Sequence, residues 1–330
     1  MASSKQLIGM IRSHAAGDDS RFLAIAEHIA LDAEKAGRTR MAGELLGLIK
    51  NLRAETETRR PATRPTPISA PRGELAGLMR AAYPEARLSD LILPESLDAR
   101  IRSIVREHNA RETLAEHGLT PRRKILLSGP PGTGKTTTAA VLAGELGLPL
   151  FTIMLDGVIT KYMGETAAKL RLIFDAVQSV RGVYLFDEVD ALATSRGADN
   201  DIGEARRMLN SLLQFLDEDS SGSILIAATN HPGLLDSAIF RRFDAALVYQ
   251  HPTSDEIERV LCSNLLQFDL GNINWHELTS VALGLSQADL AAAAKDAARH
   301  AVLDNDGVIE TANLSRSISD RAQLHSNSST

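Results

Sequence analysis

The chain has 330 residues, of which 44% are hydrophobic and 24% charged, and its formal net charge is −6. This composition is typical of a soluble globular protein with a sizeable core and disfavours a generally basic nucleic-acid-binding protein. The single cysteine, Cys262, excludes an intramolecular disulfide, and no apolar run approaches the roughly 20 residues of a membrane-spanning helix, so we expect a cytoplasmic protein with no membrane segment.

Residues 1–58 are expected to form an N-terminal α-helical module. Apolar residues recur at spacings of three and four from Leu7 to Ile29 and again from Met41 to Leu52. This spacing is typical of amphipathic helices. Two interpretations of the module stay open, a simple bundle and an adaptor for a partner.

Residues 59–87 are expected to form a linker and a lead-in to the next domain. Four prolines between residues 61 and 71 forbid a helix and favour extended backbone. The arginines of residues 59–72 have no acidic residue among them. Such a segment either contacts nucleic acid or an acidic surface, or is simply solvated.

Apolar strands alternate with helices throughout residues 88–250. We expect strands at residues 124–128, 148–155, 183–188, 223–228 and 245–249. The alternation predicts an α/β fold, a parallel sheet with helices on both faces. Residues 251–314 turn wholly helical and predict a smaller α-helical domain, and the Ser-rich residues 315–330 predict a polar, frayed tail.

Residues 129–136, with the sequence G-P-P-G-T-G-K-T, fit the phosphate-loop pattern G-x-x-x-x-G-K-[ST]. They lie between a predicted strand and a predicted helix, where glycines turn backbone N–H groups toward an anion and the helix N-terminus adds positive charge. The alternative, an ordinary glycine-rich turn, does not explain these flanks. We therefore predict that the chain binds a nucleoside triphosphate through Pro131, Gly132, Thr133, Gly134, Lys135, Thr136 and Thr137.

Within this loop, Lys135 is expected to reach the β- and γ-phosphates, and the Thr136 hydroxyl to ligate Mg²⁺. Two acids end a later buried strand, at the edge of the sheet where ligands bind in open α/β folds. Asp187 is a candidate Mg²⁺ ligand beside Thr136, and Glu188 a candidate general base for the attacking water. Asn230 ends the following strand, so we expect it at the same edge, orienting water or contacting the γ-phosphate.

Arg241 and Arg242 close the series of polar candidates. Phosphoryl transfer gains from an arginine placed on the developing charge, in cis or in trans. Surface ion pairing is the alternative interpretation for both side chains.

Four motifs occur together in order: G-P-P-G-T-G-K-T, F-D-E at residues 186–188, A-T-N at residues 228–230 and R-R-F-D at residues 241–244. This set resembles the AAA ATPases, a P-loop NTPase family, over residues 88–314. The resemblance implies an α/β subdomain, a helical lid, and a homo-oligomeric, usually hexameric ring that binds ATP and Mg²⁺ at its subunit interfaces.

The resemblance also implies roles for single residues. Asp187 and Glu188 correspond to the second nucleotide motif, Asn230 to the first sensor, and Arg241 and Arg242 to arginine fingers that complete a neighbour's site. The arginine segment is two residues shorter than the common R-x-G-R-F-D form, so both arginines are candidates for the finger.

Three further segments resemble parts of the family. Lys161, Tyr162 and Met163 look like the pore loop that grips a polypeptide. Ala288 belongs to a segment similar to the lid motif near the ribose and adenine, and Gly118 occupies the place that usually packs on adenine. Gln287 stands where that lid motif usually has glycine, which puts the adenine contact there in question. Compact bacterial members with R-R-F-D endings look similar, and some sit beside a subtilisin-like serine protease.

Three functions follow as hypotheses. The first is an ATP-driven ring that remodels, unfolds or threads a protein partner through Tyr162 and Met163. The second is an ATP-dependent switch, antitoxin- or activator-like, that controls a partner enzyme such as a protease. The third is a DNA-associated ATPase, which the acidic balance and the likeness to a pore loop disfavour.

Overall fold

The computed structural model describes residues 73–158, 165–192, 199–234, 237–304 and 306–328, together with residues 25, 26, 28–30, 43, 47 and 71. By its internal contacts the chain divides into two compact units, Met1–Ile68 and Ser69–Thr330. Most of the predicted helical module and linker lies outside the described residues. The elements below belong to the second unit.

A six-stranded sheet organises the α/β part. Its strand order is β1–β3–β4–β5–β2–β6, and every neighbouring pair is parallel except β1 with β3. The strands are β1 (Met79–Ala82), β2 (Lys124–Ser128), β3 (Leu150–Ile153), β4 (Val183–Phe186), β5 (Ile224–Thr229) and β6 (Ala245–Val248). The predicted α/β fold is therefore confirmed. The antiparallel edge strand β1 lies in the segment that the sequence analysis assigns to the lead-in, because four residues carry too little periodicity to predict a strand.

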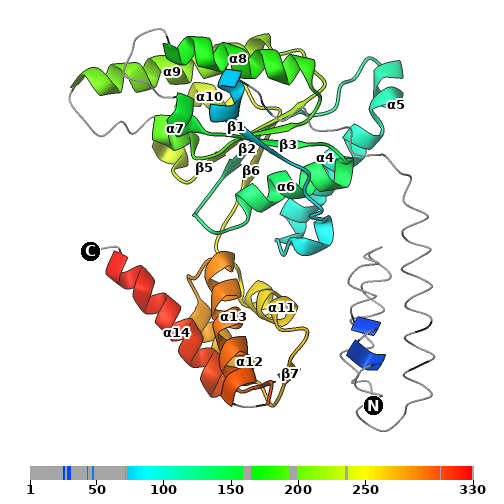
Figure 1. Cartoon of the computed structure of the whole chain (residues 1–330), viewed down its shortest axis with the longest axis vertical. Coiled ribbons are helices and arrows are strands. Elements are labelled where there is room, and N and C mark those ends of the chain that lie inside the picture. The colour runs from blue at the N-terminus through cyan, green and yellow to red at the C-terminus, as the bar shows by residue number, and fades with distance from the viewer. Residues whose placement is uncertain are drawn as a thin grey trace. The chain divides into compact units, whose positions relative to one another are not determined.

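Successive residues of the central strands face opposite sides of the sheet. In β4, Tyr184 and Phe186 pack with α8 and α9, whereas Val183 and Leu185 pack with α4 and α6. All four side chains are buried. Figure 1 shows the resulting layers, with α8 and α9 on one side of the sheet and α4 and α6 on the other. Burial on both faces explains why the strands are continuous apolar runs.

The helices of this part follow the strands in chain order. The α-helices are α4 (Glu95–Asn109), α5 (Arg111–Glu116), α6 (Lys135–Leu146), α7 (Leu155–Val158), α8 (Glu165–Ser179), α9 (Asp199–Glu218) and α10 (Ser237–Phe240). The 3-10 helices are η1 (Gly73–Gly77), η2 (Leu88–Asp90), η3 (Val189–Leu192) and η4 (Pro232–Leu234).

The C-terminal part is helical and has its own apolar core. Its elements are α11 (Ser254–Asn264), α12 (Trp275–Ala282), α13 (Gln287–Asp304), α14 (Thr311–Ser328) and a short parallel pair, β7 (Asp269–Leu270) with β8 (Val308–Ile309). Helix α13 packs against both α11 and α14. Its buried face is a row of alanines, and small side chains let neighbouring helices approach closely.

The expected polar tail at residues 315–330 needs correction, because residues up to Ser328 belong to α14. Leu314 and Ile318, one helical turn apart, are both fully buried in the core of this part. Together with Ala322 and the ion pair between Arg321 and Asp296, they dock a helix whose other residues are mostly polar. Among the described residues, no helix has the length and apolar character needed to cross a membrane.

Candidate functional site

The turn between β2 and α6 forms the phosphate loop. Gly129, Gly132 and Gly134 have φ angles of 144°, 72° and 97°, a region that favours glycine. A Cβ on Gly129 would lie 2.3 Å from the carbonyl oxygen of Tyr249, so a side chain does not fit there. The loop leads into the first turn of α6, whose N–H groups and partial positive charge suit an anion.

Lys135 is the first residue of α6, and only 6% of its surface is exposed. Its Nζ donates to the carbonyl oxygens of Gly129 and Pro130, both at 2.7 Å. Burial lowers the pKa of this ammonium, and nearby carboxylates, Asp187 foremost, oppose that shift. The side chain is thus a cation held between the loop and the acidic end of β4.

Thr136 joins the loop to β4. Its Oγ1 donates to Oδ2 of Asp187 at 2.7 Å, and the N–H of Glu188 donates to Oδ1 of the same carboxylate at 3.0 Å. Glu188 has a φ of 53°, which is uncommon for a residue with a side chain and is found at functional sites where the surroundings enforce it. The two acids are therefore presented at the cavity by a tightly constrained turn.

The pair formed by Thr136 and Asp187 fits a magnesium ion. A hydroxyl and a carboxylate oxygen are the ligands that Mg²⁺ takes when it is also bound by substrate phosphates. The described residues contain no group of three or more His, Cys, Asp or Glu that could hold a metal by itself. The donor set therefore suits an ion that arrives with a nucleotide.

Asn230 follows β5 and lies at the same edge of the sheet. Its backbone N–H donates to Oδ1 of Asp190 at 3.1 Å, and Asp190 is only 7% exposed. Asp190 is not among the site residues predicted from the sequence. Its position three residues after Asp187 is the signal that could have found it, because the first turn after a strand stays at that strand's end.

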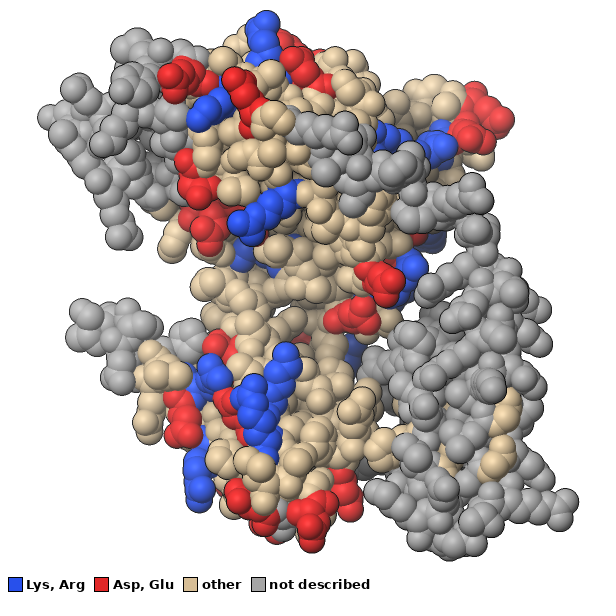
Figure 2. Space-filling model, in the orientation of Figure 1, with Lys and Arg blue, Asp and Glu red and all other residues tan. Residues whose placement is uncertain are grey.

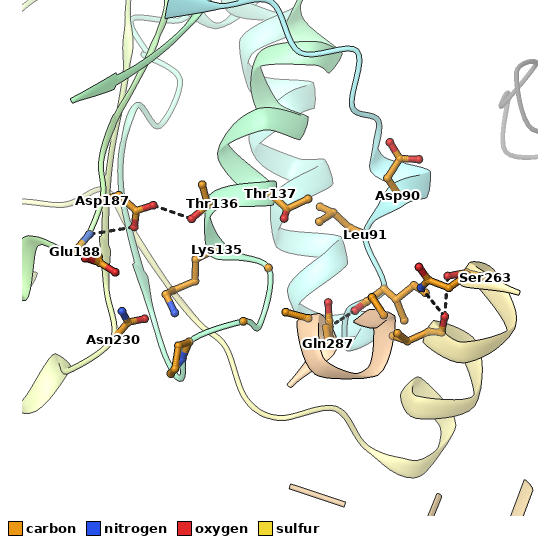
Figure 3. A pocket seen from close by; sticks show the side chains of 18 residues that line it. Asp90, Leu91, Lys135, Thr136, Thr137, Asp187, Glu188, Asn230, Ser263 and Gln287 are labelled. Carbon is orange, nitrogen blue, oxygen red and sulfur yellow. Dashed lines mark hydrogen bonds between the residues drawn. The ribbon is translucent and has the colours of Figure 1, made fainter. Parts of the chain in front are cut away.

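One end of a cavity of about 440 Å³, shown in Figure 3, is lined by Lys135, Thr136, Asp187, Glu188 and Asn230. Its other end, here called the base end, is lined by Asp90, Leu91, Ile92, Val260, Ser263, Asn264 and Ala291. Gln287 and Ala288 line it between the two ends, and the N–H of Ala288 donates to the carbonyl oxygen of Gly132 at 3.1 Å. Three segments far apart in the chain thus meet at the base end, and two of them, residues 90–92 and 260–264, carry no local motif.

Most of the residues predicted to bind nucleotide line this cavity: Pro131, Gly132, Gly134, Lys135, Thr136, Thr137, Asp187, Glu188, Asn230 and Ala288. Thr133 does not, since it is buried and its Oγ1 donates to the carbonyl oxygen of Pro130 at 2.7 Å, which holds the loop in shape. Gly118 also lies elsewhere. It follows α5, is exposed, and donates its N–H to the carbonyl oxygen of Ala115.

The two arginines differ in their surroundings, and neither lines the cavity. Nε of Arg242 donates to Oδ2 of Asp217 in α9 at 2.7 Å. Arg241 is exposed and forms no ion pair with a described residue. The predicted pore-loop residues Lys161, Tyr162 and Met163 lie outside the described residues.

Comparisons with known proteins agree with this geometry. Residues 125–250 match the model of the family described as "ATPase family associated with various cellular activities (AAA)". The chain is 38% identical over 246 residues to an uncharacterized AAA family ATPase of Sinorhizobium fredii, y4kL, and the match covers 74% of each chain.

Two relatives are named ATP-dependent zinc metalloproteases. FtsH 1 of Symbiobacterium thermophilum is 34% identical over 235 residues, which cover 69% of this chain and 40% of the relative. FtsH of Helicobacter pylori is 30% identical over 256 residues, which cover 74% of this chain and 40% of the relative. The chain therefore spans about two fifths of the length of these two proteins.

Proposed function

This chain belongs to the AAA family of ATPases. We propose that it hydrolyses ATP as a hexameric ring of subunits and uses this to remodel, unfold or thread a protein partner. One observation supports the proposed ring: Arg241 is exposed and does not line the cavity of its own subunit. An arginine that assists phosphoryl transfer from such a position has to act on a neighbouring subunit.

Within one subunit we assign the following roles. Lys135 binds the β- and γ-phosphates, and Thr136 and Asp187 hold Mg²⁺, which neutralises phosphate charge when bound. The Glu188 carboxylate accepts a proton from the attacking water. Asn230 orients that water. The contact of Thr136 with Asp187 supports this assignment, because it joins the loop to the acidic strand end at 2.7 Å.

Arg241 is our candidate for the finger. Its partner in sequence, Arg242, is engaged by Asp217, which fixes the segment on α9 and leaves Arg241 exposed. The shortened arginine motif is thus interpreted as one anchoring arginine and one acting arginine.

A mixing experiment tests the trans role of Arg241. Arg241→Ala and Lys135→Ala subunits are each expected to be inactive alone, the first for lack of a finger and the second for lack of nucleotide. A 1:1 mixture should regain about a quarter of wild-type ATP turnover, because a quarter of randomly formed head-to-tail interfaces pair an intact site with an intact finger. A mixture as inactive as its components contradicts the shared site.

The protein partner is proposed from two supports. The FtsH relatives are named ATP-dependent proteases, and residues 161–163 resemble a polypeptide-gripping loop. The peptidase activity in those names is not carried over, since the match spans 40% of each relative. Unfolded casein should stimulate ATP turnover of the wild type but not of Tyr162→Ala. Equal stimulation of both proteins removes the gripping role.

The regulatory switch is the second candidate, and the solution mass of Glu188→Gln separates it from the ring. A shift to a ring-sized species on addition of ATP and Mg²⁺ supports the ring, whereas a persistent monomer supports a switch that acts through a partner. A DNA-associated role gains no support from the surface drawn in Figure 2, where acidic and basic side chains are interspersed over the described residues.

A further inference from the structure

Gln287 lies in the middle of the cavity, at the first position of α13. Figure 3 shows its side chain between Lys135 of the phosphate loop and Ser263 of the base end. Its Nε2 donates to the backbone carbonyl oxygen of Ile92 at 2.6 Å, across 195 positions of sequence. Its Oε1 lies on the side of the loop, 3.5 Å from where a Cβ on Gly134 would be. The side chain thus spans the cavity.

The backbone on both sides of Gln287 is fixed. The N–H of Ala288 donates to the carbonyl oxygen of Gly132 at 3.1 Å. The Ser286 hydroxyl donates to the carboxylate of Asp289. A Cβ on Gly132 would lie 2.4 Å from the Oγ of Ser286. The start of α13 is thus held close to the loop, and from this position the Gln287 amide reaches across the cavity to Ile92.

Ile92 is suited to bind a base that carries an amino group. Its carbonyl oxygen is the acceptor that Gln287 uses, and no described residue accepts its N–H. The surrounding side chains of Leu91, Val260 and Ala291 are apolar, as in pockets where a few backbone groups orient a flat ligand. Adenine carries an amino donor at C6 next to a ring nitrogen acceptor, so it could use both backbone groups.

We propose that Gln287 is an internal competitor for the adenine amino group, and that ATP has to displace its amide from Ile92 to bind. This inference rests on the proposed function, which puts ATP in this cavity. A carboxamide NH₂ and an aromatic amino group are the same kind of donor, and Nε2 of Gln287 already occupies a donor position 2.6 Å from the Ile92 carbonyl oxygen. Because Gln287 belongs to α13, base binding then breaks one of the two hydrogen bonds that join the described residues of that helix to the α/β part.

Two nucleotides and one substitution test the competition. Gln287→Met keeps the length of the side chain and removes its donor. Calorimetric titration without Mg²⁺ compares ATP with purine riboside triphosphate, which has hydrogen in place of the amino group. The variant should bind ATP about 3- to 10-fold more tightly than the wild type, the range expected when one hydrogen bond no longer has to be broken. The Kd of the purine riboside nucleotide should stay within about twofold.

Two controls accompany the titration. Gln214→Met makes the same substitution at an exposed glutamine of α9 whose amide donates to Glu218, and it should leave both Kd values unchanged. Gln287→Ala should repeat the preference for ATP if the methionine variant folds poorly. A similar gain for both nucleotides, no change, or weaker ATP binding would overturn the competitor role.

Failure of the proposed site is distinguishable in the same assay. If Lys135→Ala binds ATP as well as the wild type, ATP does not occupy this cavity and the proposed function fails with it. If Lys135→Ala loses ATP binding while Gln287→Met changes neither Kd, only the competitor role is rejected.

Discussion

The two ends of the cavity are built in different ways. The phosphate end is a continuous loop and two strand ends, held by side chains such as the buried Lys135 and by the contact of Thr136 with Asp187. The base end brings together residues 90–92, α11 and the start of α13, three segments far apart in the chain. We expect the continuous end to keep the fixed distances that chemistry needs, and the assembled end to respond when a ligand group moves its elements relative to each other.

The largest expected effect concerns the phosphate end. Replacing Lys135 by Ala removes a buried cation, so the Kd of ATP should rise about 100-fold, in line with the loss of hydrogen bonds to a charged group. Val260→Ala at the base end should raise the Kd less than about 10-fold, because it removes only apolar contact. Titration with ATP measures both. Similar losses of ATP affinity in the two variants would contradict the proposed difference between the two ends of the cavity.

A substitution at Asp190 separates an effect on the chemical step from an effect on ATP binding. Asp190→Asn weakens the charged acceptor that holds the N–H of Asn230, so kcat should fall roughly 10-fold while the Kd of ATP changes less than twofold. Asp156→Asn, at an exposed position of α7, is the matched control and should alter neither value. A rise in Kd with normal kcat would mean that Asp190 supports binding and not the position of Asn230.

Gly132 lies where the two ends touch. Gly132→Ala combines a φ of 72° with a Cβ 2.4 Å from Oγ of Ser286, so it should weaken ATP binding about 5- to 10-fold through displacement of α13. Gly147→Ala is the control, because its φ of 62° is as unfavourable but its surroundings are open. It should lower thermal stability and leave the Kd unchanged. Adding Ser286→Gly to Gly132→Ala should recover part of the affinity for ATP. No recovery would mean that the contact between Gly132 and Ser286 does not affect ATP binding.

Glu107 tests a region that belongs to neither end. Arg122 hydrogen-bonds its carboxylate and lowers its pKa, so this pair stabilises the fold above the ordinary pKa of glutamate and loses that contribution as the pH falls through the lowered value. Glu107→Gln should cost about 1 kcal/mol at neutral pH and less below pH 4.5. Thermal melts of the wild type and of Glu107→Gln, at neutral pH and below pH 4.5, measure the loss of stability at each pH. ATP turnover at neutral pH should be unchanged.

The difference between the ends also explains what could be predicted from the sequence. The phosphate end is encoded locally: a glycine loop between a strand and a helix, and acids at a strand end, are visible without any tertiary information. The base end is encoded only in part: Gln287 belongs to the segment that resembles the lid motif, whereas Ile92 and Ser263 carry no motif and are brought together only by the fold. The expectation for Gly118 gains no support from the fold, since this exposed residue is not among those that line the cavity.

The measurement that tests the central claim most directly is a photolabelling map with 8-azido-ATP. If the phosphates bind at the loop and the base at the other end, labelled peptides should come from residues 88–93 or 260–264, and Lys135→Ala should abolish the label. Label in residues 111–118, or label that persists in Lys135→Ala, would contradict this orientation of ATP in the cavity.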